Sequence, residues 1–514
     1  MARYKPRDQH VSKLLPVSFE AQILPGSFEY ALSWLIDHEI DLSVFDARFG
    51  NDDTGATAYD PGVLLKIVLY AYSRGLVSSR SIERACRDNV VMMALSGDTQ
   101  PHFTTLAGFV SSLSAEITQV FRDVLLVCDE QGLIGKQMFA VDGCKLPSNA
   151  AKEWSGTRAD FQRKADKMEK AVEYLLSQHQ ARDVGECDDE IIERERRQIQ
   201  TLRESSGKLR QWLKSNAEDK RGLSGKPVKS NLTDNHSALM KTGHGVIQGY
   251  TGVAAVDSEH QVVVHAEAFG VGQENALLPQ VLDATAEHFE SLGQPDALKD
   301  VAVTADAGYH SEDTLKKLAD QEIDAYVADT NFRKRDPRFA QAYRHKPEER
   351  QRVPGERRSQ WYQAQDFDFN PDALSCRCPA GQVLKLSTRN AVIKGMRAIT
   401  FEGTRQTCGN CPLRVKCLRK PDVSPYRQIA FFGDKVYDRH PHTHRMKQKI
   451  DSRQGRAIYA RRLGTVEPVF AHLRGRGLHR FTLRSRRKVD AQWKLFCIVH
   501  NVQKIRRYGT VGRV

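Results

Sequence analysis

Two aspartates stand where carboxylates can do chemistry, each directly after a short apolar run. Asp142 follows residues 137–141 and Asp306 follows residues 301–305, which places both at the ends of predicted buried strands. Strands that are distant in sequence can be neighbours in a sheet, and two adjacent carboxylates repel each other unless a cation lies between them. Oxygen ligands of this kind suit Mg²⁺ or Mn²⁺. Taken alone, each aspartate is more often a turn residue or a helix cap.

A third acid, Glu467, lies in a basic segment that is predicted to be helical. It borders an apolar stripe with the spacing 4, 3, 4, 3, formed by Tyr459, Leu463, Val466, Phe470 and Leu473. Glu467 is the only acidic residue between Asp451 and Asp490. An isolated carboxylate in such surroundings pairs with a cation, either an arginine or a metal ion. The nearby phosphate-seeking side chains favour a metal site beside a DNA backbone; they are Arg461, Arg462, Arg474, Arg476 and Arg480.

Five of the ten cysteines fall within 42 positions, at Cys376, Cys378, Cys408, Cys411 and Cys417. Two close pairs separated by about 30 residues are typical of tetrahedral zinc in a small ribbon. Cys408 and Cys411 are the clearest ligands, together with one or both of Cys376 and Cys378. Cys417 either replaces Cys376 or is spare. The alternative is a set of incidental free thiols. Structural zinc would serve folding and DNA contact, because no open coordination position is implied.

The charge of the chain is strongly divided. Its 514 residues carry a net charge of +13, but residues 331–514 contain 42 Lys and Arg against 14 Asp and Glu, which leaves 35 against 50 in the rest. A segment with an excess of 28 positive charges would repel itself, so a polyanion such as nucleic acid is the expected partner. No apolar run approaches the roughly 18–20 residues that span a bilayer. The N-terminus also lacks the apolar stretch of a signal peptide, so a cytoplasmic, nucleoid-associated protein is expected.

The hydrophobic patterning predicts an α/β protein with four parts. Residues 1–130 form a helical, DNA-binding domain, with helix starts near Asp60, Ser79 and Thr104. Residues 131–330 hold a mixed sheet, interrupted at 151–230 by a helical hairpin whose loop lies around Gly185. The predicted strands of this sheet are 137–143, 246–256, 261–269, 301–305 and 323–328, with helices over 275–289 and after Ser311. A basic linker (331–358) and the cysteine region make up 331–435. Residues 436–514 are basic and loop-like to 458, then helical from about Ala457 to Arg507.

Three segments carry a resemblance to a known family. Val141-Asp-Gly-Cys-Lys, Thr304-Ala-Asp-Ala-Gly-Tyr and Thr465-Val-Glu-Pro-Val-Phe resemble the catalytic blocks of bacterial DDE insertion-sequence transposases, in the long group that contains a zinc ribbon. Further similar segments follow the family's order, at residues 59–65, 75–83, 104–106, 249–257, 477–481, 489–495 and 500–501. The resemblance implies a ribonuclease H-like sheet that bears two acids and a later helix that bears the third. Spacings of 164 and 161 residues between the acids are long, and the hairpin and the cysteine region account for them.

The resemblance also implies an activity. A transposase cleaves DNA at the terminal inverted repeats of its element and transfers the strands to target DNA, acting as a homo-oligomer that is expected to be a dimer. Two-metal phosphoryl transfer would use Asp142 as the bridging ligand, with Asp306 and Glu467 each completing one side. DNA would contact Lys145, Tyr459, Arg461, Arg462, Arg474, Arg476 and Arg480. The alternatives are a non-catalytic DNA-binding descendant and a nuclease of the same fold that lacks strand transfer.

The sequence departs from the family at one set of residues. Relatives carry a Tyr, Arg, Glu and Lys set around the last acid that handles flipped DNA ends. Here Tyr459 is one residue too far from Glu467, and Arg474 replaces the lysine, which keeps the charge but changes the geometry. A DNA hairpin intermediate therefore does not follow from this set.

Overall fold

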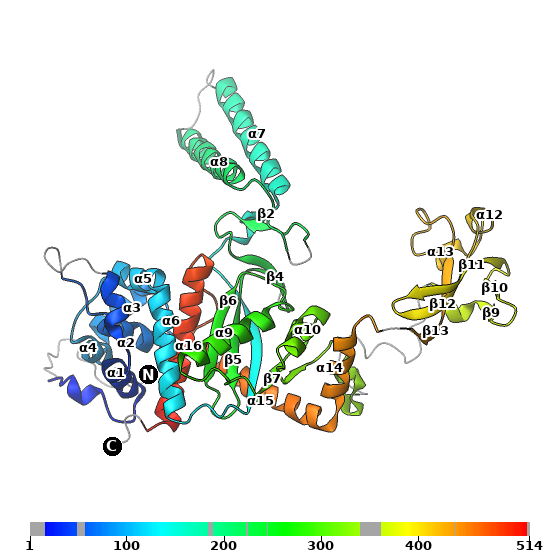
Figure 1. Ribbon diagram of the computed structural model, residues 1–514. Coiled ribbons are helices and arrows are strands. Elements are labelled where there is room, and N and C mark those ends of the chain that lie inside the picture. Colours follow the sequence, from blue (N-terminus) through cyan, green and yellow to red (C-terminus); the bar gives the residue numbers. More distant parts are fainter. Residues whose placement is uncertain are drawn as a thin grey trace, which may run out of the picture. The chain divides into compact units, whose positions relative to one another are not determined.

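The computed structural model describes residues 16–48, 57–182, 189–222, 225–243, 245–339, 361–436 and 438–510. It divides into two compact units, one made of Met1–Val327 with Ser452–Val514 and the other of Ala328–Asp451. Figure 1 shows their elements, coloured along the chain. None of the described helices has the length and apolar character needed to cross a membrane.

The first part of the larger unit is helical, as the sequence predicts. Six α-helices follow one another: α1 (Phe28–His38), α2 (Pro61–Ser73), α3 (Ser79–Asp88), α4 (Val90–Ser96), α5 (Phe103–Ser112) and α6 (Ser114–Glu130). Short 3₁₀ turns at Glu20–Gln22 and Leu42–Arg48 accompany them. The Asp60 carboxylate accepts hydrogen bonds from the first backbone amides of α2, and the Ser78 hydroxyl does so for α3. These caps explain why both helices begin where they do.

A six-stranded mixed sheet forms the centre of the larger unit. Five strands follow the order β4 (Ala238–Thr242), β5 (Gly245–Asp257), β1 (Met138–Pro147), β7 (Ala302–Ala305) and β8 (Ala325–Val327). β6 (Val263–Phe269) also pairs with β5. β5 is antiparallel to β1, β4 and β6, whereas β1, β7 and β8 run parallel. Helices α9 (Leu277–Ser291) and α10 (Glu312–Asp320) connect the later strands. The mixed sheet is compatible with the ribonuclease H-like fold that the resemblance implies.

Several expectations about individual elements are wrong. β1 does not end at Asp142 but continues to Pro147, because residues 143–147 keep pairing with β5. The short strand β4 has no clear alternation and was not predicted. Residues 435–458 are not a loop, since α14 covers Pro441–Asp451 and α15 (Arg453–Gly475) begins directly after the Ser452 cap. Leu463 does not belong to the buried stripe of α15, because it is 42% exposed.

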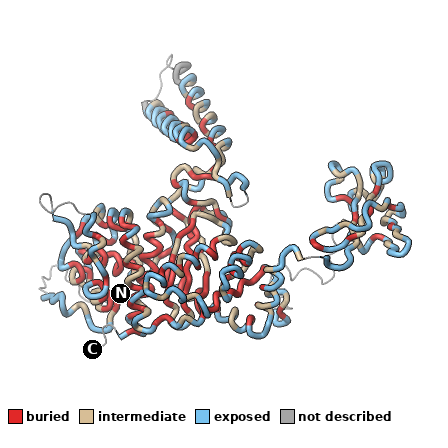
Figure 2. The backbone as a smooth tube through the Cα atoms, viewed as in Figure 1, coloured by how far each residue is buried: buried red, intermediate tan, exposed pale blue. Residues whose placement is uncertain are grey.

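The last helix, α16 (Arg486–Tyr508), covers the free edge of β6. Among the described strands, β6 pairs only with β5. The Asn501 amide replaces a further strand: its Oδ1 accepts from the Val263 N–H at 2.8 Å, and its Nδ2 donates to the Val263 carbonyl at 2.9 Å. The Asp490 carboxylate accepts from the Ala268 N–H at 2.8 Å. Figure 2 shows that α16 and the sheet are largely buried. The helix therefore satisfies an edge that would otherwise be open to pairing with another chain.

Replacing Asn501 with leucine is expected to destabilise this unit by about 2–6 kcal/mol. The substitution leaves the buried N–H and C=O of Val263 without partners, and each such group costs about 1–3 kcal/mol. Hydrogen exchange measured by mass spectrometry should show faster exchange at 261–269, together with a lower melting temperature. Asn501→Asp keeps the acceptor, so its exchange rate and melting temperature should lie between those of Asn501→Leu and those of the unaltered protein. Unchanged exchange in Asn501→Leu would show that the edge is satisfied by other groups.

Two long helices, α7 (Arg158–Arg182) and α8 (Asp189–Ser215), lie side by side after β1 (Figure 1). Their contact is a small core near the base of the pair, formed by Phe161, Ala165, Leu209, Trp212 and Leu213. Arg210 strengthens it by pairing with Asp166 at 2.6 Å and with Glu169 at 2.5 Å. The predicted loop around Gly185 lies outside the described residues. Short elements flank the pair: a 3₁₀ turn (Lys152–Trp154) and the two-stranded β2 (Ser155–Gly156) and β3 (Ser230–Asn231).

The smaller unit is built on a five-stranded antiparallel sheet. Its order is β13 (Gln428–Lys435), β12 (Met396–Glu402), β11 (Val383–Ile393), β10 (Ser375–Arg377) and β9 (Asp368–Asn370). Two short helices, α12 (Arg405–Gly409) and α13 (Arg414–Cys417), lie between β12 and β13. Three 3₁₀ turns occupy Arg333–Arg335, Pro337–Phe339 and Ala364–Asp366. Most of the predicted linker, residues 340–358, lies outside the described residues.

Candidate active site

Asp142 and Asp306 are brought together by the parallel pairing of β1 and β7. The last paired residues of these strands are Val141 and Ala305, so the two aspartates are the next residues along each strand. Neighbouring strands lie about 4.8 Å apart, and residues in register point to the same side of the sheet. Two carboxylates from segments 164 residues apart therefore share one end of the strand pair.

Asp142 is largely buried and is held by two groups. Its Oδ1 accepts from the Gly143 N–H at 2.8 Å, and its Oδ2 pairs with the Arg462 guanidinium at 2.6 Å. Burial raises the pKa of Asp142, Arg462 lowers it, and the neighbouring Asp306 raises it further. Burial and a like charge thus outweigh the arginine, which leaves a carboxylate that additional positive charge would stabilise.

Asp306 caps the 3₁₀ turn Ala307–Tyr309, and its Oδ1 accepts from the Gly308 N–H at 2.8 Å. Tyr309, the last residue of this turn, is fully buried, and its hydroxyl has no hydrogen-bond partner among the described residues. Burial raises the pKa of Tyr309 well above its usual value, and Glu274, Asp142 and Asp306 add to the effect. The hydroxyl therefore stays protonated, as a donor close to the acids.

Glu467 joins the two aspartates from α15. Its helix docks through Val466, Phe470 and Leu473, which are all buried, whereas Glu467 is exposed beside them. Pro468 lies inside the helix without ending it. All three predicted acids line one open pocket, together with Lys145, Lys241, Glu274, Phe470, Arg474 and His479.

Glu274 is a fourth carboxylate in this pocket, and the sequence analysis missed it. It precedes α9 and forms an ion pair with Lys145 at 3.6 Å. Burial raises the pKa of Glu274 to about 7; Lys145 lowers it, and Asp306 and Asp142 raise it. The only signal in the sequence is an acid just before a predicted helix that follows a strand. That position is common in any α/β protein and does not single out a site.

The predicted DNA contacts are placed differently from one another. Lys145 and Arg474 line the acid pocket, whereas Arg462 is buried and paired with Asp142. Arg461 and Arg480 are exposed outside the pocket lining, where they donate to Ser258 and to Asn149, each at 3.4 Å. Arg476 and Tyr459 also lie outside the lining and are half-buried. Burial lowers the pKa of Arg476.

Two other buried aspartates of the larger unit, Asp257 and Asp234, have structural roles. Asp257 accepts from the N–H groups of Lys136 and Glu259, which makes it a hairpin turn residue. Asp234 accepts from the Tyr250 hydroxyl at 2.8 Å and from the Ser485 N–H at 3.1 Å. Neither lines the acid pocket.

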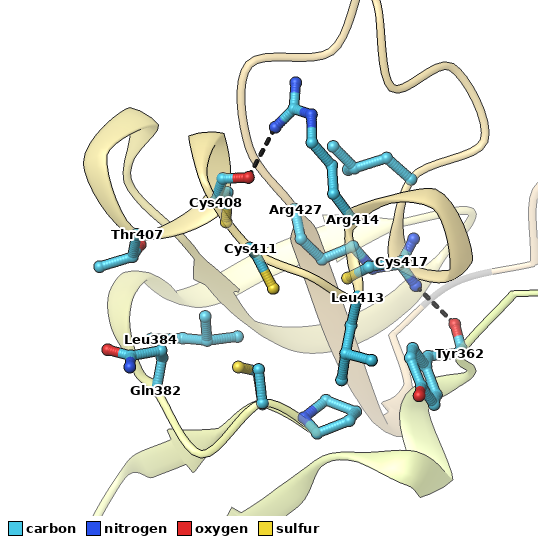
Figure 3. Close-up of a pocket in the computed structure, with 14 residues that line it drawn as sticks. Tyr362, Gln382, Leu384, Thr407, Cys408, Cys411, Leu413, Arg414, Cys417 and Arg427 are labelled. Atoms are coloured by element: carbon cyan, nitrogen blue, oxygen red, sulfur yellow. Dashed lines mark hydrogen bonds between the residues drawn. The ribbon is translucent and has the colours of Figure 1, made fainter.

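The five clustered cysteines separate into four and one. Cys378, Cys408, Cys411 and Cys417 line a single pocket in the smaller unit. Figure 3 shows Cys408, Cys411 and Cys417 approaching it from α12, the turn that follows and α13. Burial raises the pKa of Cys417; Arg427 lowers it, and the thiols of Cys408, Cys378 and Cys411 raise it. These four sulfurs are therefore close enough to affect one another.

Cys376 lies apart from this pocket. It is buried on β10 in an apolar cluster with Phe367, Leu384, Phe401 and Ile429, and burial raises its pKa to about 11. Gly403 makes room for the sulfur of Cys408, with which a Cβ at that position would collide. The geometry thus divides a set that spacing alone could not divide.

Within the described ranges, no three His, Cys, Asp or Glu side chains are arranged so that they could hold a metal ion. In the acid pocket, the protein's own cations occupy two of the carboxylates, Arg462 at Asp142 and Lys145 at Glu274. A divalent cation that binds there would have to displace or reposition these partners.

Two family models match the chain. A transposase domain of the type DUF772 matches residues 17–112, which contain α1 to α5. A transposase DDE domain matches residues 377–506, a range that begins in the cysteine region, includes Glu467 and ends in α16. The comparisons with curated proteins and with solved structures give no match.

Proposed function

The chain belongs to the insertion-sequence DDE transposases, and on that premise we propose that it cleaves DNA at the terminal inverted repeats of its element and joins the freed 3′ ends to target DNA. One observation carries the proposal. The acids of three segments spread over more than 300 residues line the same pocket, and two of them lie next to each other on parallel strands.

Mg²⁺ or Mn²⁺ is the proposed cofactor, since carboxylate oxygens are the ligands that these ions prefer. Asp142, Asp306 and Glu467 would hold the ions. When bound, such ions activate the attacking oxygen and stabilise the leaving oxygen of an in-line displacement. The chain itself would supply the positioning: Lys145, Lys241 and Arg474 line the pocket and can hold phosphates beside the acids.

The family's substrate is DNA, and the excess of positive charge over residues 331–514 suits it. We further propose that the protein acts as a dimer that pairs two element ends, in the nucleoid of a bacterial cytoplasm. This last point rests on the family alone.

Arg474→Met is expected to weaken DNA binding about equally for all sequences and to reduce the slope of log K against log [salt] by about 0.9, the loss of one phosphate contact. Arg474 is exposed in the pocket and is not assigned to the metal site. Fluorescence anisotropy between 50 and 300 mM salt measures the slope. Lys299→Met is the matched control, because Lys299 is exposed before the start of β7, at the opposite end from Asp306. An unchanged slope in Arg474→Met would show that Arg474 does not contact a DNA phosphate.

We also propose structural Zn²⁺ held by Cys378, Cys408, Cys411 and Cys417, whose side chains would have to move into ligand positions when the ion binds. Their shared pocket, which Cys376 does not line, supports this set over any set that includes Cys376. Four thiolates form a closed tetrahedral site, so the ion would stabilise the small unit and take no part in strand cleavage.

The decisive experiment uses a labelled duplex that ends in the element's inverted repeat, a supercoiled target plasmid and Mg²⁺ or Mn²⁺. A transposase nicks the end and yields plasmid joined to the labelled 3′ strand. Cleavage without joining would identify a nuclease of the same fold. Binding without cleavage would identify a non-catalytic DNA-binding descendant.

A further inference from the structure

Both glycines in the two aspartate motifs leave room for the same side chain, that of Glu274. A Cβ on Gly143, the residue after Asp142, would lie 3.3 Å from Glu274 Oε1. A Cβ on Gly308, two residues after Asp306, would lie 2.7 Å from Glu274 Oε2 and 2.9 Å from Asp306 Oδ1. The Glu274 carboxylate therefore lies beside both motif segments. A Cβ on Gly308 would displace it, whereas a Cβ on Gly143 would first meet Thr251 Cγ2 at 2.9 Å.

The surroundings of Glu274 favour a bound cation over a simple surface ion pair. Its side chain is only 12% exposed and shares its pocket with Asp142, Asp306 and Glu467. The buried Tyr309 hydroxyl has no hydrogen-bond partner among the described residues. A Cβ on Gly143 would lie 3.2 Å from this hydroxyl, so it is close to the Glu274 carboxylate. Lys145 is the basic residue that pairs with Glu274, and its 3.6 Å separation is longer than the 2.6 Å between Arg462 and Asp142.

Resting on the proposed function, we propose that Glu274 is a fourth carboxylate ligand of the divalent-metal site. Lys145 pairs with Glu274 in the metal-free protein and is released toward a DNA phosphate when the cation binds. In this arrangement a single lysine exchanges one anion for another, so metal loading and DNA phosphate binding favour each other. Gly308 is required because a side chain at that position would displace the Glu274 carboxylate.

Mn²⁺ binding to the full-length protein without DNA tests the proposal, with free Mn²⁺ measured by electron paramagnetic resonance. Glu274→Gln should weaken Mn²⁺ binding by at least about tenfold, the lower limit seen even for residues that only support a ligand. Glu290→Gln, an exposed acid on α9, is the matched control and should bind as the unaltered protein does. Gly308→Ala should weaken Mn²⁺ binding without removing any carboxylate from the sequence, because its Cβ would displace Glu274 Oε2 and Asp306 Oδ1.

Lys145→Met separates a ligand from a structural ion pair. If Glu274 binds the ion, removing the competing lysine should tighten Mn²⁺ binding by about two- to fivefold, and this gain should disappear in the Lys145→Met, Glu274→Gln double variant. If Glu274 only pairs with Lys145, Glu274→Gln will bind Mn²⁺ normally, which overturns the proposal. Failure of the proposed function would look different, because Asp142→Asn would then bind Mn²⁺ normally as well.

Discussion

Strand cleavage is expected to be abolished when Asp142, Asp306 or Glu467 is replaced by alanine, while DNA binding is retained. Metal ions held by these acids would supply several kcal/mol of transition-state stabilisation, and about 4 kcal/mol corresponds to a thousandfold in rate. Binding survives because phosphate contacts come from basic residues outside the acids. A gel assay of end cleavage, with anisotropy for binding, measures both. Asp313→Ala, an exposed acid on α10, is the control and should cleave normally.

The three variants are not equivalent in stability, and this decides how the result is judged. Asp142→Ala leaves the buried Arg462 without its carboxylate, and breaking a buried pair typically costs about 3–5 kcal/mol. Asp142→Asn, which retains hydrogen bonding, should accompany it, and a melting curve should show that the protein is folded. Glu467 is exposed, so Glu467→Ala should keep full stability. Retained cleavage in Glu467→Ala would show that Glu467, the acid contributed by α15, is not needed for cleavage.

Loss of any one of the four pocket thiols is expected to release zinc and unfold the small sheet around residues 361–435. Structural zinc contributes about 10–16 kcal/mol of apparent binding energy near pH 7, as much as the roughly 5–15 kcal/mol that stabilises a whole domain. Cys408→Ser or Cys411→Ser should therefore lower bound zinc from one ion per chain to none, by mass spectrometry of the metal. Hydrogen exchange over β9 to β13 should rise in parallel.

Cys376→Ser is the matched control for this experiment, since the cysteine is two residues from Cys378 yet buried in the apolar cluster. It should keep its zinc and lose some stability, because a hydroxyl replaces a buried thiol. Zinc retained in Cys417→Ser but lost in Cys376→Ser would reverse the assignment. Absence of zinc from protein produced in zinc-supplemented medium would exclude the site altogether.

The strands were predictable where their sequence signals are local. β5, β6 and β7 were found because apolar residues run continuously or alternate. α3 was predicted to start near Ser79, one residue after its cap Ser78, and α10 was predicted from Ser311, which is its cap. The true length of β1 was not predictable, since residues 143–147 are held only by pairing with β5, a segment about 100 residues away. Long-range pairing of this kind leaves no periodic trace in the strand itself.

The site shows the same division between local and distant causes. Asp142, Asp306 and Glu467 were identified from motifs, but Arg462 was predicted to contact DNA and is instead buried against Asp142. Glu274 was not predicted, because its position in the pocket depends on how segments far apart in the sequence pack together. The set of candidate zinc ligands was reduced from five cysteines to four only by the structure, in which β10 places Cys376 in the apolar core.

The order in which the chain is made gives α16 a further significance. At about 5–20 residues per second, Glu467 leaves the ribosome roughly 8–32 s after Asp306, and the segment that seals β6 follows later still. Until then the nascent sheet has an open edge and an incomplete set of acids. A chain that stops before α16 lacks the helix that seals β6 and against which α1, α2, α5 and α6 pack. Premature termination would therefore leave both the sheet edge and the N-terminal helices without a main packing partner.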